Sequence, residues 1–170
     1  VSANVFVDNT ETGQRTGLSA QYQMALPNGS LMFTPGLTRA TTGTVYWTSD
    51  FQWQQDLPTG SFSAEWSQQV TSQNEDDEEV VLSDVFLSYS HTLNPLNSFR
   101  FNLDWAQQVY TVSDDTSTNT SFGAVWSHSL ARDWNLDLGY LYRISDEDTE
   151  DSAQSNTVYL ELNRDFTTRY

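Results

Sequence analysis

Residues 98–109 read SFRFNLDWAQQV, and their apolar side chains fall mainly at every second position. A period of two places successive side chains on opposite faces of an extended strand. A helix would instead bring Phe99, Arg100 and Asp104 to one side. The segment is therefore predicted to be a β-strand with one apolar face and one polar face.

The same alternation recurs along the chain between polar stretches of two lengths. Short turns are predicted at residues 27–30, 58–60, 94–97 and 131–133. They alternate with longer polar loops, predicted at residues 9–14, 41–43, 74–79, 113–119 and 146–155. This order predicts about ten antiparallel strands in an up-and-down meander, with both termini at the tight-turn end. Pro35 cannot donate to a ladder, so we expect an edge or a bulge there.

Alternation does not by itself say which face meets water. Aromatic residues make up 14% of the chain, and a barrel with all of them inside would fill its interior with nearly every large side chain. The alternate set is mostly Ser, Thr, Gly, Asn and Gln, which suits a hydrated lumen. Many predicted strands reach about 12 residues, which suits a tilted membrane span of about 9–11 residues better than a typical globular strand. We therefore predict an all-β fold in one domain, residues 1–170: an up-and-down antiparallel transmembrane β-barrel of about ten strands, with eight or twelve as alternatives.

A soluble β-barrel or sandwich binding module, with the aromatic residues in a core or a ligand pocket, is the alternative that the same alternation allows. Two observations favour lipid contact. The outward aromatic residues lie mainly toward the tight turns, as an interfacial belt requires, although Trp105 and Trp126 fall nearer mid-strand. The chain also lacks Lys, which commonly protects the edges of soluble sheets. The predicted lipid-facing aromatic residues are Trp47, Trp53, Trp66, Phe99, Phe101, Trp105, Trp126, Trp134, Tyr140, Phe166 and Tyr170.

Charge and composition exclude several classes of function. A net charge of −16 opposes nucleic-acid binding, because a phosphate-binding surface requires clustered Lys and Arg. The absence of Cys excludes a disulfide framework and Cys-based zinc sites. No apolar run is long enough for a transmembrane helix, and the opening VSANV is not a signal peptide, so we expect a mature or trimmed chain. A fragment of a larger barrel is an alternative, because the chain begins abruptly and its first strand is short.

The chain ends in VYLELNRDFTTRY, an alternating segment with an aromatic last residue. This segment resembles the final strand of Gram-negative outer-membrane β-barrels, and LNRDFTTR is similar to the ending of the β-barrel porin 2-like proteins. It lacks the usual glycine, since Asn163 and Asp165 stand in that region. The resemblance implies an outer-membrane location, with tight turns toward the periplasm and acidic loops outside. It also implies contact with membrane lipid, with the barrel-assembly machinery during biogenesis, and with lipopolysaccharide at the loops.

Few residues could carry catalysis. His91 and His128 both fall on the outward parity near the tight turns, so interfacial structural roles are expected. Ten strands also resemble the omptin proteases of the outer membrane, but these use a His at the extracellular rim, and neither His lies at that end. No nucleophile-elbow, zinc-protease or phosphate-loop motif is present. We therefore expect no enzyme activity and no cofactor.

Two acidic runs fall in predicted loops. Carboxylate oxygens bind divalent cations, but neither run has the spacing of a calcium-binding loop, and solvated loops that carry negative charge are the simpler interpretation. The first run is the candidate metal site and consists of Glu75, Asp76, Asp77, Glu78 and Glu79. The second run contains Asp146, Glu147, Asp148, Glu150 and Asp151.

Charged residues of both signs share the inward parity. Buried charges tend to pair, which predicts a closed, hydrogen-bonded lumen; the excess of carboxylates predicts instead a narrow, cation-preferring pore. Hairpin pairing is expected to place Arg100 beside Ser90, and Arg143 opposite residues 157–159. We expect a monomeric, non-enzymatic membrane protein that is either such a channel or a closed scaffold for surface interactions. The predicted lumen-lining residues are Asp50, Glu65, Asp84, Arg100, Asp104, Asp137, Arg143, Glu161, Asp165 and Arg169.

Overall fold

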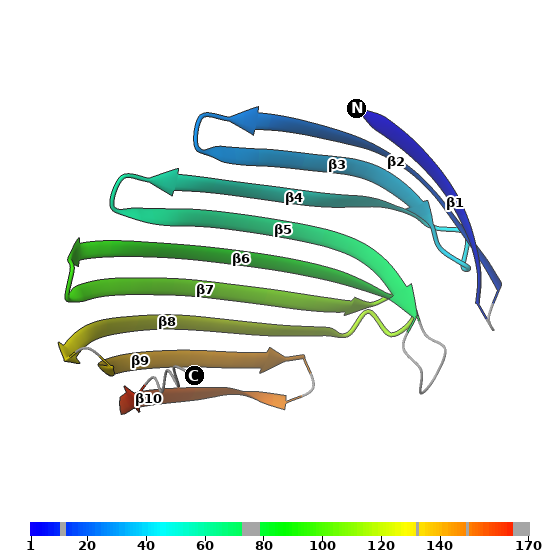
Figure 1. Ribbon diagram of the computed structural model, residues 1–170. Helices are drawn as coiled ribbons and strands as arrows, with labels where there is room; N and C mark the ends of the chain where they lie inside the picture. The colour runs from blue at the N-terminus through cyan, green and yellow to red at the C-terminus, as the bar shows by residue number, and fades with distance from the viewer. Residues whose placement is uncertain (11–12, 73–78, 132, 149, 165–170) are drawn as a thin grey trace, which may run out of the picture.

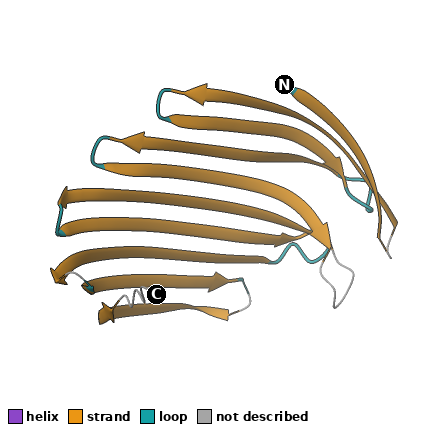
Figure 2. Ribbon diagram, in the orientation of Figure 1, coloured by secondary structure: helices purple, strands orange, loops and turns teal. Residues whose placement is uncertain are grey.

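The computed structural model describes residues 1–10, 13–72, 79–131, 133–148 and 150–164. These residues form ten strands in one antiparallel sheet whose spatial order is the chain order, which confirms the predicted all-β, up-and-down meander (Figures 1 and 2). The sheet is open, with the first and last strands as its two edges (Figure 1). None of the described residues forms a helix long and apolar enough to cross a membrane. The strands are β1 (Ser2–Thr10), β2 (Gly13–Leu26), β3 (Gly29–Arg39), β4 (Val45–Leu57), β5 (Gly60–Ser72), β6 (Glu79–Asn94), β7 (Asn97–Tyr110), β8 (Thr116–Ala131), β9 (Trp134–Glu147) and β10 (Glu150–Arg164).

The two ends of the sheet differ in their connections. Two-residue turns at 27–28, 58–59 and 95–96 confirm the first three predicted tight turns. At the other end, here called the loop end, the predicted loops 113–119 and 146–155 are wrong in extent, because β8 already begins at Thr116 and only residues 148–149 separate β9 from β10. Ser, Thr, Asn and Asp favour turns in isolation, yet here their backbones continue the ladder. In the first of these segments, Thr116 and Thr118 suit a strand.

Cross-strand register defines two faces, because residues directly opposite one another point to the same side. The apolar face contains the row Tyr22, Phe33, Phe51, Trp66, Val85 and Trp105, on β2 to β7. Its next row contains Met24, Leu31, Trp53, Ala64, Leu87 and Leu103. The polar face lies between these rows in sequence and contains the row Gln52, Glu65, Phe86, Asp104, Ser121 and Arg143.

Very little apolar surface is buried within the described residues. The buried hydrophobic residues are Ala40, Ala64, Val70, Val80 and Val81. Large side chains of the apolar face stay exposed, with Trp47 at 47% and Leu138 at 44%. The described strands form one sheet, with no second layer of a sandwich over this face. The described residues therefore leave the apolar face uncovered.

The hairpins are displaced along the strand direction from one side of the sheet to the other. Figure 1 shows the tight turns stepping from β2–β3 through β4–β5 to β6–β7. The apolar residues follow the same displacement. Val5 on β1 lies in a row that ends at Trp47 on β4, through Leu18 and Leu37. Leu160 on β10 lies in a row that reaches Leu57 on β4, through Leu138, Trp126, Phe99, His91 and Gly60.

Val5 is the middle one of Ala3, Val5 and Val7 on β1, and Leu160 is the middle one of Val158, Leu160 and Leu162 on β10. Their rows meet β4 at Trp47 and Leu57, which are ten residues apart, so the centre of the apolar residues moves by ten positions between β1 and β10. We call this inclined set of apolar residues the apolar band.

The pairing of β2 with β3 is interrupted near Pro35. It stops at Ser19–Gly36 and resumes at Tyr22–Phe33, so Pro35 has no partner on β2. The expected edge or bulge is wrong: β3 lies inside the sheet, Pro35 lies opposite Ser49 on β4, and β2 and β3 keep the same register on both sides of the interruption.

Candidate functional site

The described members of the predicted lumen-lining set all lie on the polar face. Register places each of them in a row of polar-face residues, although they come from six different strands. Asp165 and Arg169 lie outside the described residues. The members found on the polar face are Asp50, Glu65, Asp84, Arg100, Asp104, Asp137, Arg143 and Glu161.

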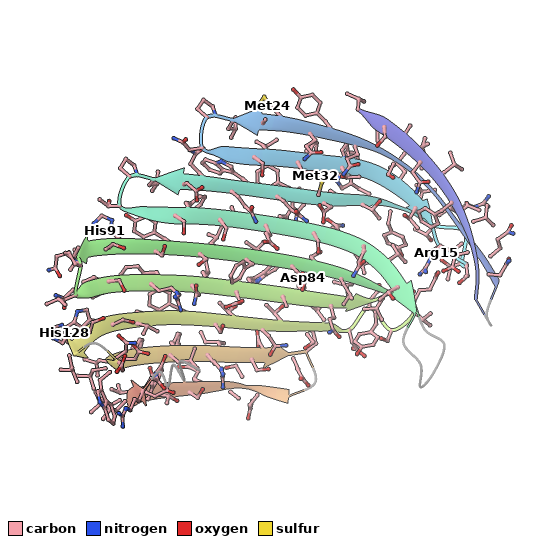
Figure 3. All side chains as sticks on the ribbon, viewed as in Figure 1. Arg15, Met24, Met32, Asp84, His91 and His128 are labelled. Carbon is pink, nitrogen blue, oxygen red and sulfur yellow. The ribbon has the colours of Figure 1, made fainter. Side chains whose placement is uncertain are left out.

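Four carboxylates occupy four neighbouring strands at the middle of the polar face. Asp50 and Asp84 share one row with Ser67 between them, and Glu65 and Asp104 share the next. We call these four side chains the carboxylate arc; Asp84 is labelled in Figure 3, near the centre of the sheet. Ser67 Oγ donates to Asp84 Oδ2 over 3.3 Å. The arc therefore places four negative groups at nearly one level across β4 to β7.

The carboxylate arc borders hollows on the polar face. One of about 210 Å³ is lined by Asp50, Glu65, Asp84 and Phe86 among others. A larger one of about 560 Å³ extends from Asp84 to Arg143 and on to β10. The carboxylates thus border open space along this side of the sheet.

Arg100 and Arg143 do not form, among the described residues, the ion pairs that a charge-paired lumen would require. Arg100 lies opposite Ser90, as predicted. Arg143 lies opposite Ser155 and not residues 157–159, because the β9–β10 connection is shorter than predicted and moves the register. Within the described residues, neither Arg forms an ion pair, whereas Arg15 pairs with Asp8.

Arg15 is a polar-face residue that sequence reasoning did not single out. Its Nη2 lies 2.6 Å from Asp8 Oδ2, and its Nη1 donates to the Val70 carbonyl oxygen over 2.9 Å. This contact runs from β2 to β5 at the loop end, where β4 and β5 cease to pair beyond Ser49–Gln68; Arg15 is labelled in Figure 3. The Arg15 side chain is 13% exposed. Arg15 therefore holds the first strands against β5 on the polar side. The sequence could have indicated its ion pair, because Arg15 and Asp8 flank the first predicted loop.

The acidic runs are only partly within the described residues. Glu75, Asp76, Asp77 and Glu78 lie outside them. Glu79 was predicted in a loop, but it begins β6 and is buried, and its Oε2 accepts from the Thr41 N–H over 2.8 Å. No group of three or more His, Asp or Glu residues suited to a metal ion occurs in the part of the chain that the structure describes.

The predicted lipid-facing aromatic residues that are described all share the apolar face. They are Trp47, Trp53, Trp66, Phe99, Phe101, Trp105, Trp126, Trp134 and Tyr140. Phe166 and Tyr170 lie outside the described residues. Trp126 was expected nearer mid-strand, but it shares a row with Phe99 close to the tight turns. The Trp53 and Phe62 rings meet edge to face, 5.0 Å apart, so the aromatic residues at this end also contact one another.

The tight-turn end of the apolar face has polar side chains only at its rim. His91 Nδ1 lies 3.3 Å from Thr59 Oγ1, and His128 Nδ1 lies 2.9 Å from Asn97 Oδ1. Both histidines stack on an aromatic neighbour of the same strand and are labelled at the strand ends in Figure 3. Among the described residues from the Phe51 row to the tight turns, this face carries no Asp or Glu. Acidic side chains are thereby kept off the surface that carries the aromatic residues.

Two aromatic residues on the polar face cover glycines near the edges of the sheet. Phe6 on β1 lies opposite Gly17, and Tyr159 on β10 lies opposite Gly139. A Cβ added to either glycine would overlap the facing ring. The sequence pattern does not reveal these contacts, because the pairing depends on the register of each terminal hairpin.

The two faces offer different chemistry. The apolar face can bury its aromatic and aliphatic side chains only against another apolar phase or molecule, and the polar face can attract cations to its carboxylates. Comparison of the chain with protein-family models, with curated proteins and with solved structures gave no match.

Proposed function

We propose that this chain is an integral outer-membrane β-barrel protein without enzyme activity, and that its polar face lines a narrow, cation-preferring pore. The observation that carries the proposal is the inclination of the apolar band. A band that meets a flat lipid layer must stay level in the membrane while the strands tilt, so its residues must shift along each successive strand.

The size of the shift supports membrane insertion. Nine strand-to-strand steps cover about 43 Å, and ten residues cover about 33 Å along a strand, so the band is inclined by about 38° to the hydrogen-bonding direction. Strands of membrane barrels tilt by about 35–45°. A level apolar belt around tilted strands accounts for this inclination.

The exposure of the apolar face supports lipid as its solvent. Soluble monomers rarely expose large contiguous apolar patches, and here the exposed apolar residues extend from Leu18 on β2 to Leu160 on β10, which are 55% and 69% exposed. The soluble binding module would require a covering layer or an aromatic core. The described residues supply neither, because most of their aromatic side chains lie on the uncovered face.

The carboxylate arc supports the cation preference. Rings of Asp or Glu select cations in channels, and the arc borders hollows in which its charges meet no Arg partner among the described residues. A closed scaffold for surface interactions is the second candidate. Side-chain hydrogen bonds across the polar face, such as that from Ser88 Oγ to Asn102 Oδ1 over 2.9 Å, favour it, because the interiors of small barrels can be filled by side chains.

The location and orientation belong to the same proposal. The resemblance of the final strand to outer-membrane barrels supports the outer membrane of a Gram-negative bacterium, with tight turns toward the periplasm. We expect a monomer surrounded by lipid and inserted by the barrel-assembly machinery. Lipopolysaccharide and divalent cations are the partners expected at the acidic loops.

Extraction tests the membrane part of the proposal. The full chain, reconstituted in phosphatidylcholine vesicles, should remain with the vesicles in alkaline carbonate and leave them only in detergent. Release of a folded β protein into buffer without detergent would favour the soluble module and reject membrane insertion.

Planar-bilayer recording tests the pore. In a KCl gradient, the reconstituted chain should give small conductance steps with a reversal potential displaced toward the K⁺ equilibrium potential. Insertion without any conductance would favour the closed scaffold, and an anion-selective conductance would reject the cation-preferring pore.

A further inference from the structure

The first and last strands each leave one edge unpaired. β1 has 9 residues and β10 has 15, and the described side chains of both strands are exposed. Exposed edges of this length are templates for pairing with another strand. Because ten strands alternate in direction, β1 and β10 run antiparallel to each other. They can therefore form an ordinary antiparallel ladder without any change in strand order.

We infer that the β10 edge is completed by β1 of the same chain, in the register that places Val5 opposite Leu160 and Phe6 opposite Tyr159. The register follows from the apolar band, because a closed belt must return to its starting level after one circuit. Val5 and Leu160 are the members of the band whose rows are ten residues apart. An even displacement is also required, since an odd one would place apolar residues opposite the polar face.

This register matches the side chains on both faces. On the apolar face it pairs Val7 with Val158, Val5 with Leu160 and Ala3 with Leu162. A register two residues away in one direction brings Arg164 opposite Ala3. The register two residues away in the other direction brings Asn156 opposite Val7. The ten-residue displacement is the one that keeps all three positions apolar.

The glycines on the polar face permit the two strands to approach. The Phe6 ring lies over Gly17 on β2, and the Tyr159 ring lies over Gly139 on β9. Each ring therefore leans away from the unpaired edge of its own strand. The row across the completed junction becomes Gly17, Phe6, Tyr159 and Gly139, with two aromatic residues facing each other between two glycines. Because each ring lies over the glycine of its inner neighbour, neither ring occupies the space over the junction, and the two backbones can approach to the spacing of a ladder.

The N-terminal part of the sheet already curls toward the polar face. Arg15 reaches from β2 to the Val70 carbonyl of β5. A hollow of about 360 Å³ on the same side is lined by residues from β1 to β5, including Phe6 and Thr34. This curvature favours closure within one chain over pairing between two copies, and an intramolecular strand also benefits from a higher effective concentration.

Disulfide cross-linking tests the junction, because the chain has no Cys of its own. The full chain carrying Val5→Cys and Leu160→Cys, in detergent micelles under mild oxidation, should form an intramolecular disulfide, since facing antiparallel residues have the Cα separation that a disulfide requires. Matched controls combine Val5→Cys with Val158→Cys or with Leu162→Cys. We expect about tenfold less intramolecular product from each control, because offset positions exceed disulfide reach. The polar-face pair Asn4→Cys with Glu161→Cys repeats the test where apolar packing is not altered.

Each outcome decides the inference. Stronger linkage to position 158 or 162 overturns the register. Linkage mainly between copies overturns closure within one chain, and absence of both products in both test pairs, with thiols that react with a maleimide, overturns the junction. The inference rests on the proposed barrel but fails separately from it: a chain that resists carbonate extraction and links only between copies would keep the membrane proposal and lose this one.

Discussion

Phe51 and Gln52 are neighbours on β4, yet they belong to surfaces with opposite requirements. The face of Phe51 carries large aromatic and aliphatic side chains that no other part of the described chain covers. The face of Gln52 carries hydroxyl, amide and charged groups around hollows. In a soluble sheet the apolar face is packed and the polar face is wet. Here the described residues supply no packing partner for the apolar face, and this difference is what the proposed lipid contact explains.

Substitution of Phe51 by Arg is the strongest test of this comparison. Phe51 lies in the middle of the β4 part of the apolar band, so Phe51→Arg should lower the free energy of unfolding in phosphatidylcholine bilayers by about 2–4 kcal/mol. Gln52→Arg on the opposite face is the matched control and should change it by less than about 0.5 kcal/mol. Urea titration of the reconstituted variants measures both. Equal losses in the two variants would mean that the faces do not differ in solvent.

Substitution of glycines on the polar face tests the packing of side chains on that face. Gly139→Ala should destabilise the chain by about 1 kcal/mol, because the Tyr159 ring must leave its place over β9. Gly123→Ala is the control, since the nearest atom that its Cβ would meet, Leu141 Cδ1, is 4.0 Å away. That control should be neutral or stabilising by about 0.4–1 kcal/mol. The same urea titration compares them, and a Gly139 variant as stable as the Gly123 variant would contradict the close packing of Tyr159.

Neutralisation of the carboxylate arc has the smallest expected effect on stability but a visible one on selectivity. Glu65→Gln combined with Asp84→Asn should reduce the K⁺ to Cl⁻ permeability ratio by about threefold at 10 mM salt, and by much less at 1 M, because the Debye length falls from about 30 Å to about 3 Å. Asp114→Asn, in the loop after β7, serves as the control. Reversal potentials in planar bilayers measure the change. An unchanged ratio at low salt would remove the arc from the pore.

The sequence predicted the strands and their faces because both depend on local pattern. A period of two determines which side chains share a face, and this assigned Asp84 and Trp105 to their faces correctly. Proline and glycine similarly marked the tight turns. The starts of β8 and β10 were predicted less well. Polar residues such as Ser, Thr and Asn tolerate both loop and strand, and hydrogen bonding to a neighbouring strand decides between them.

The contacts across strands could not be predicted in the same way. The position of Tyr159 over Gly139 and the reach of Arg15 to Val70 require the register of two or more strands at once. Glu79 was assigned to a loop because it follows four carboxylates, whereas its burial depends on Thr41, which is distant in sequence. Long-range pairing, and not residue type, determines these features.

The placement of the carboxylate arc on adjacent strands has an electrical consequence. Arg143 shares a row with Asp104 but stands two strands away and forms no ion pair with it among the described residues. At the level of the carboxylate arc, negative charge gathers on β4 to β7, and a positive group lies two strands away on β9. In the proposed closed barrel, this separation would produce a field directed across the lumen and not along it. A dipolar solute that enters such a field is turned before it advances, so the interior would sort molecules by their orientation as well as by their charge.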